Sequence, residues 1–207
     1  MRGPKTKYPT GLVAAFLLVA SACSILPPQT DHSRYFVLEP LSGSDTPANG
    51  SSHSQNLTVG LGPITIPLYL DRPEVLTRLS ETEFSVSDTD RWAEPLDASV
   101  SRVLAQDLSS DLPSVQIVPY PWSHKTQIDY RVSVDFRRLE RTADGKAEVQ
   151  AVWTINKGVS NKLMRRGITT SSALAGDDQR SASAALSQGI SQVSREIAQA
   201  LEQQSQA

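Results

Sequence analysis

Few residues of this 207-residue chain are arranged as catalytic or metal-binding residues usually are. The three histidines, His32, His53 and His124, are isolated, and no His-x-x-x-His or Glu-x-x-His pair occurs. Gly60-Leu61-Gly62 lacks the third glycine and the lysine of nucleotide-binding loops, and no serine lies in Gly-x-Ser-x-Gly. The sequence therefore predicts no catalytic residue, no bound metal and no cofactor, and hence a protein that is not an enzyme.

Cys23 is the one residue with an evident chemical role. It is the only cysteine, which excludes a disulfide framework and a multi-cysteine metal site. A basic start and the apolar residues 11–20 precede it, and that apolar segment is too short to span a membrane, which takes roughly 20 residues. Ala20-Ser21-Ala22-Cys23 resembles the bacterial lipobox, with Ala20 where leucine is usual. Residues 1–22 are therefore expected to be a lipoprotein signal peptide, and Cys23 the site of lipid attachment.

The alternative for this segment is ordinary cleavage after an Ala-x-Ala site. Cys23 would then remain a free thiol, which is a liability in an oxidising compartment. Lipidation is the better supported of the two interpretations.

Charge restricts the partners of the mature chain. Removing residues 1–22 takes away three basic side chains and no acidic one, so the formal charge moves from −2 to −5. This excludes nucleic acid as an obvious partner, and it means that acyl chains, rather than basic residues, hold the protein at the membrane lipid. Residues 23–33 are expected to be the lipidated N-terminus and a polar tether. In Gram-negative lipoproteins an aspartate directly after the cysteine tends to retain the protein in the inner membrane, so by resemblance Ser24 favours the outer membrane.

Two helices are predicted from apolar stripes at spacings of three and four residues. The first follows Pro95 and stops at Pro113, with its stripe at Leu96, Val100, Val103, Leu104, Leu108 and Leu112. The second runs from about Ser181 to Gln203 and follows Asp177 and Asp178, whose negative charge favours a helix N-terminus; its stripe is Ala182, Leu186, Ile190, Val193, Ile197 and Leu201.

Strands are predicted from short β-prone runs and from alternation. The runs are 34–38, two short strands within 57–70 joined at Gly62-Pro63, 115–118, 130–136, 149–155 and 162–170. The last three form a β-meander. The order β-β-β-α-β-β-β-β-α predicts a single α+β domain over 34–207, in which two amphipathic helices pack on one face of a mainly antiparallel sheet.

Two segments between these elements are candidates for partner contact. Ile66–Pro73 places Tyr69 and Arg72 between prolines, and Asp90–Leu96 places Trp92 just before the first helix. Aromatic and arginine side chains are frequent anchors of interfaces. The structural alternative makes Arg72 a turn residue and Trp92 a hydrophobic staple of the helix.

At these residues the chain resembles the PqiC (YmbA) family of ABC-type transport auxiliary lipoproteins. The matching positions are Tyr35–Leu38, Pro67–Pro73 and Arg91–Leu96, with Phe36-Val37 departing from the more usual Tyr-x-Leu spelling. The resemblance implies a lipoprotein of the outer membrane that faces the periplasm. It further implies docking to an MCE-domain periplasmic transport protein and its inner-membrane components, which move lipids or other hydrophobic molecules, and no catalytic residues.

Other interpretations remain open at this point. The domain could instead be a lipid-binding module that holds the cargo itself, or a periplasmic hydrolase, for which the motifs give almost no support. If Tyr69, Arg72 and Trp92 are structural, the expected docking surface is an exposed edge of the meander near Arg137, Arg138 and Arg141. The sequence also leaves open whether the chain forms a homo-oligomer.

Overall fold

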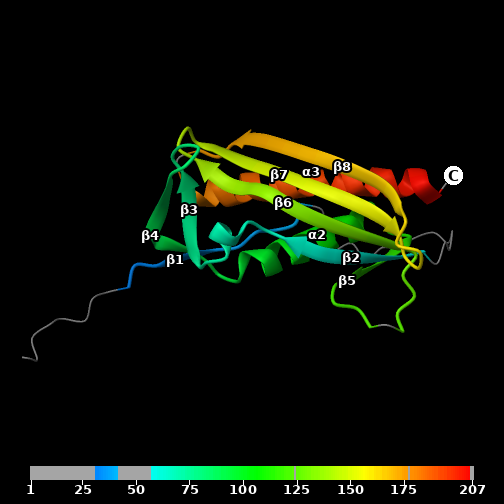
Figure 1. The fold of residues 1–207 in the computed structure, drawn as a ribbon. Coiled ribbons are helices and arrows are strands. Elements are labelled where there is room, and N and C mark those ends of the chain that lie inside the picture. The colour runs from blue at the N-terminus through cyan, green and yellow to red at the C-terminus, as the bar shows by residue number, and fades with distance from the viewer. Residues whose placement is uncertain (1–30, 42–56, 124, 177, 206–207) are drawn as a thin grey trace, which may run out of the picture. The chain divides into compact units, whose positions relative to one another are not determined.

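The computed structural model, which describes residues 31–41, 57–123, 125–176 and 178–205, is built around one long central strand, β6 (Figure 1). By their contacts, Ser33–Ala207 form one compact unit. In chain order its elements are β1 (Arg34–Phe36), β2 (Leu57–Thr65), the 3-10 helix η2 (Leu68–Leu70), β3 (Glu74–Arg78), β4 (Phe84–Trp92), α2 (Leu96–Asp111), β5 (Val115–Pro119), β6 (Tyr130–Thr142), β7 (Lys146–Lys157), β8 (Leu163–Leu174) and α3 (Gln179–Ser205).

Strand β6 has neighbours along both of its edges. One edge pairs with β7, and β7 pairs with β8, in the antiparallel meander that the alternating pattern predicted. The other edge is shared: β2 runs parallel to the first half of β6, and β3 runs parallel to its last residues. From there the sheet forks into a β2–β5 branch and a β3–β4–β1 branch. The α+β class is confirmed, and the long pairings are antiparallel.

Both helices cover the same face of this sheet. Each residue of the two predicted stripes is buried, and α3 runs behind β6, β7 and β8 in Figure 1. Helix α3 comes so close to β7 that a side chain at Gly189 would collide with Val149. The opposite face of the meander carries the polar residues of the alternation, and no helix among the described residues covers it.

The start of α3 follows the expected helix chemistry. The Ser181 backbone N–H and hydroxyl both donate to the Asp178 carboxylate, at 3.0 and 2.8 Å. These hydrogen bonds lower the pKa of Asp178. Asp177 lies outside the described residues.

The expectation of two short strands within 57–70 was wrong. Leu57–Thr65 is one strand, and the break at Gly62-Pro63 appears instead as a register shift between Leu61 and Ile64 against β6. An irregularity of this kind lets a strand pass a proline without ending. Four strands rather than three precede the first helix, because β3 and β4 follow η2.

Candidate functional site

The three segments that carry the family resemblance meet at one end of the sheet. Strand β1 pairs in parallel with the end of β4, so that Arg34–Phe36 lie opposite Asp90–Trp92. The Ala93 N–H extends this ladder by donating to the Phe36 carbonyl at 2.8 Å. The Trp92 N–H donates to the Pro73 carbonyl at 2.7 Å, which brings in the third segment. We call residues 34–36, 68–73 and 91–95 the three-segment junction.

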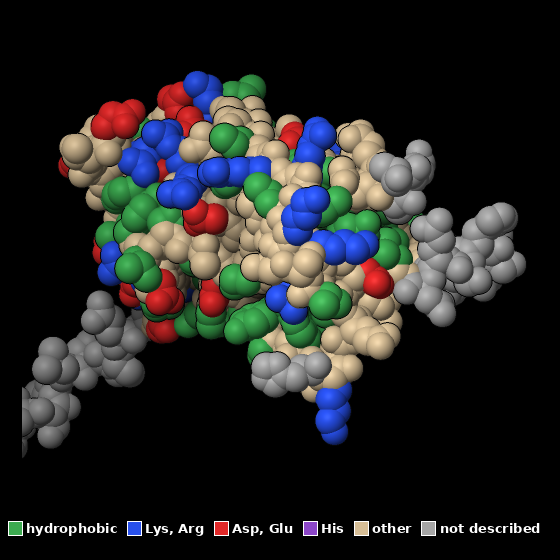
Figure 2. Space-filling model, turned by 45° about the vertical axis from the view of Figure 1, so that its right-hand side comes forward, with side chains coloured by type: hydrophobic (Ala, Val, Ile, Leu, Met, Phe, Trp, Pro, Cys, Tyr) green, Lys and Arg blue, Asp and Glu red, His purple; other side chains and the backbone are tan. Residues whose placement is uncertain are grey.

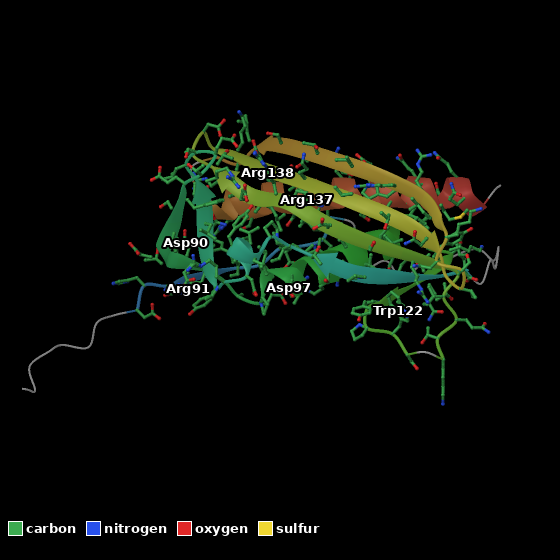
Figure 3. The ribbon with its side chains drawn as sticks, viewed as in Figure 1. Asp90, Arg91, Asp97, Trp122, Arg137 and Arg138 are labelled. Carbon is green, nitrogen blue, oxygen red and sulfur yellow. The ribbon has the colours of Figure 1, made fainter. Side chains whose placement is uncertain are left out.

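A shallow depression of about 340 Å³ opens at this junction. Its lining comes from only two of the segments: Asp71, Arg72, Pro73, Trp92, Ala93, Glu94 and Pro95. The structure thus brings Arg72 and Trp92 together, although they are twenty residues apart in the sequence. Figure 3 shows the labelled Asp90 and Arg91 at this end of the domain.

Trp92 is mainly a core residue. Its side chain belongs to the same hydrophobic cluster as Leu70, Val75 and Leu96, and only 8% of the residue is exposed. It is not a helix staple, because the cap of α2 is Pro95 and the residue before that cap is Glu94. Trp92 therefore forms the floor of the depression, and only its edge can reach a partner.

Tyr69 is tied to a buried ion pair. Its hydroxyl donates to Glu140 Oε2 at 2.8 Å, and its ring packs on Phe84 with centroids 4.8 Å apart. Arg78 Nε donates to the other oxygen of Glu140, and its guanidinium lies over the Phe84 ring. Burial, with the hydrogen bond to the Glu140 carboxylate, raises the pKa of Tyr69 to about 12. Tyr69 thus has a structural role as well as a partly exposed ring.

Arg72 belongs to a small surface cluster. Arg72 Nε and Arg91 Nη1 each donate to one oxygen of Glu74, both at 3.2 Å. The Glu74 backbone N–H and then the two arginines lower the pKa of Glu74. Exposed pairs of this kind stabilise a fold by about 1 kcal/mol or less, so Arg72 can be replaced with little effect on folding.

The junction is also fastened to the helices. Arg102 on α2 donates to Glu94 at 2.7 Å and to the Leu38 carbonyl at 2.8 Å. The Glu39 N–H donates to the Ser187 hydroxyl on α3 at 3.1 Å. The residues that follow β1 are therefore held by both helices.

Leu68 is a candidate contact residue that the sequence did not single out. It is 89% exposed and comes immediately before Tyr69. It is three residues before Asp71, which lines the depression. An apolar side chain between Pro67 and Tyr69 could have been noted, but only the structure shows that η2 turns Leu68 outward while burying Leu70.

The expectation that Arg137, Arg138 and Arg141 lie on an exposed edge of the meander was wrong. These residues are on β6, which is the central strand; the free edge of the meander is β8, which pairs with β7 alone. Arg137 and Arg138 form ion pairs with Asp135 and Glu148, and Arg141 donates to the Gly176 carbonyl.

Some residues that the sequence singled out are not among those that the structure describes. Cys23, the expected lipid-attachment residue, lies outside the described residues, as do His53 and His124. Within the described ranges, no group of His, Cys, Asp and Glu side chains is arranged to hold a metal ion. No helix in those ranges is both long and apolar enough to cross a membrane.

The chain belongs to the family of ABC-type transport auxiliary lipoprotein components, whose model matches residues 36–198. Residues 68–73 and 91–95 of the junction lie within this match, and β1 enters it only at Phe36. Among its relatives are proteins from Escherichia coli and Shigella flexneri that are named intermembrane transport lipoprotein PqiC. The protein from Escherichia coli (strain K12) is 26% identical over 125 residues, which are 60% of this chain and 64% of that protein. The match thus spans somewhat less than two thirds of the relative's length.

Solved structures share the fold. An uncharacterized protein superposes with a TM-score of 0.66 at 19% identity, covering 82% of this chain and 98% of that one. A protein from Xanthomonas campestris gives 0.60 at 18% identity, covering 84% and 100%. At such low identity the likeness supports the fold alone.

Proposed function

We propose that the protein is a non-enzymatic lipoprotein of the outer membrane that docks the periplasmic MCE-domain assembly of an intermembrane transport system. Its acyl chains at Cys23 anchor it in the membrane lipid, and the domain faces the periplasm. The observation that carries the docking role is the three-segment junction. Residues from three distant parts of the chain are hydrogen bonded to one another there, and Leu68 and Arg72 of this junction are exposed.

The comparisons support the coarser part of this proposal. The family is one of transport auxiliary lipoproteins, a description that favours a non-catalytic role. The PqiC relative is named an intermembrane transport lipoprotein. The family resemblance supports the MCE-domain partner, and Ser24 supports the outer membrane.

Replacing Cys23 by alanine is expected to abolish membrane anchoring. Stable attachment takes two or more acyl chains, and without the thiol none can be attached through a thioether. The variant should accumulate as unprocessed precursor or as soluble protein. Fractionation of cell envelopes by density measures how much of it remains with each membrane.

Ser24→Asp is the control for this experiment. It keeps the lipid but, by the same resemblance, should retain the protein in the inner membrane. If the Cys23→Ala variant still fractionates with the outer membrane as the unchanged protein does, the lipobox interpretation is wrong.

A second prediction tests docking at the junction. The double variant Leu68→Ser, Arg72→Ala removes an exposed apolar side chain and an exposed charge. Truncating interface anchors typically costs about 2 kcal/mol or more, so binding should weaken roughly 30-fold or more. Affinity capture from crosslinked envelopes identifies the partner, and titration with the purified MCE-domain protein measures the change.

The melting temperature of this double variant should stay within about 2 °C of the original, because neither side chain is buried. Arg137→Ala is the matched control: it too removes an exposed arginine paired with one acid, but on β6 and away from the junction. Equal capture by the double variant and the control would exclude the junction as the docking surface.

A further inference from the structure

A second recess lies at the other end of the domain, where the β5–β6 loop folds against β2. It is a cleft of about 610 Å³, within the range of small-molecule sites. Trp122, which is labelled in Figure 3, belongs to this loop and lies at the opposite end from Asp90 and Arg91. The cleft is therefore separate from the three-segment junction.

Two glycines of β2, Gly60 and Gly62, leave room for the aromatic side chains that line this cleft. Gly62 has a φ of +132°, and a side chain there would collide with Tyr120. A Cβ at Gly60 would come within 3.1 Å of the Trp122 ring, so this ring occupies the space above Gly60. Tyr120 and Trp122 contact each other edge to face, with centroids 5.2 Å apart. Their rings form one wall of the cleft, and Tyr120 is 59% exposed.

Arg131 lies beside this wall. Gly60 and Arg131 are register partners in β2 and β6, so their side-chain positions share one face of the sheet. The Trp122 ring above Gly60 therefore borders Arg131. On the other side Arg131 pairs in register with Asn156 of β7, which also lines the cleft.

The guanidinium of Arg131 has no anionic partner among the described residues. Its Nε is buried and makes no hydrogen bond within that part of the structure, and no ion pair joins it to a described acid. Buried donors without a partner are rare in folded proteins and call for an explanation. The described residues that line the cleft include no acid, and Arg131 is the one permanently charged side chain among them.

Neutral hydrogen-bonding groups surround this charge on several walls. They are the amides of Asn156 and Asn161 and the hydroxyls of Ser123, Thr126 and Ser133. Figure 2 shows Lys and Arg side chains spread over this side of the domain and few acidic ones. The surroundings therefore favour an anion whose oxygens point in several directions.

We propose that this cleft binds an organic phosphate ester, with the phosphate on Arg131 and the organic group against Tyr120 and Trp122. An arginine fork matches two phosphate oxygens, and the amides and hydroxyls on the other walls suit the remaining ones better than they suit a planar carboxylate. The volume far exceeds that of a bare phosphate, and the exposed aromatic pair offers contact to an attached group. The proposal is independent of docking at the junction.

Calorimetric titration of the mature lipoprotein in a neutral detergent tests this. The probes are sn-glycero-3-phosphoethanolamine and inorganic phosphate. The ester should bind several-fold more tightly than inorganic phosphate. Arg131→Gln should weaken the ester roughly tenfold or more, because a charge-assisted hydrogen bond is lost. Arg137→Gln, on the same strand and already paired with Asp135, is the control and should leave binding unchanged.

Tyr120→Ala tests the aromatic part of the cleft separately from Arg131. It should weaken the ester and leave the binding of inorganic phosphate as it was. Absence of binding at millimolar ester, equal affinity for ester and inorganic phosphate, or unchanged affinity in Arg131→Gln would each overturn the proposal.

Vesicles distinguish the source of the ester. The mature chain, residues 23–207, with Cys23→Ala has neither an acyl chain nor the apolar residues 11–20. It is mixed with phosphatidylethanolamine and phosphatidylglycerol vesicles and floated. Co-flotation that is lost in Arg131→Gln and competed by the soluble ester would identify a lipid head group. Ester binding without co-flotation would identify a soluble organic phosphate, and either result supports the site.

Discussion

Ile190→Asp is expected to unfold the domain or to destabilise it by roughly 4 kcal/mol or more. Ile190 is fully buried at the middle of α3, among the side chains that join this helix to the sheet. A carboxylate placed there would lie among apolar side chains and would lose its hydration. Chemical denaturation followed by circular dichroism measures the change.

Gln188→Asp is the control for that substitution. It introduces the same charge two residues away, at a position on α3 that is exposed. Its effect should stay within about 0.5 kcal/mol. Equal stability of the two variants would mean that α3 does not pack on the sheet in solution.

Glu140→Ala is expected to have the next largest effect. The Glu140 side chain is fully buried, and the Arg78 side chain that pairs with it is only 13% exposed. Removing one partner of a buried ion pair leaves the other charge without compensation, at a cost of about 3–5 kcal/mol. Tyr69 also loses the acceptor of its hydroxyl. The melting temperature should fall by on the order of 10 °C.

Two further variants make this prediction specific. Glu148→Ala breaks the more exposed pair with Arg138 and should cost about 1 kcal/mol or less. The double variant Arg78→Met, Glu140→Leu removes both buried charges and should recover much of the stability lost in Glu140→Ala. If Glu140→Ala is no worse than Glu148→Ala, the buried pair contributes little.

Local periodicity predicted the parts of the fold that depend on local burial. Both helices and the alternating strands β6 and β7 are where their apolar patterns indicated, because one face of each packs on the core. The strands β3 and β4 did not enter the predicted element order. Strand β3 is short, and several residues of β4 are exposed, which gives no clear alternation.

Pairing over long distances could not be predicted in this way. The register of β1 with β4 joins residues 56 positions apart. Together with the hydrogen bond from the Trp92 N–H to the Pro73 carbonyl, this pairing brings the resemblance segments together. The position of β6 in the sheet also could not be predicted. This strand has partners along both edges, so it is not the free edge that the sequence led us to expect. Arg131 looked like an ordinary outward residue of an alternating strand, and only the loop carrying Trp122 made it part of a cleft.

The way β1 is fixed has a mechanical consequence. Arg34 donates to both oxygens of Asp90, at 2.8 and 3.0 Å, and the residues just after β1 are hydrogen bonded to α2 and α3. Tension applied to the chain before Ser33 therefore enters the domain through β1 and passes at once to β4, Trp92 and both helices. The ion pair of Arg34 and the hydrogen bonds to both helices resist a force applied at the N-terminal side. The meander and α3 can therefore stay folded under a force that would detach a strand held by fewer bonds.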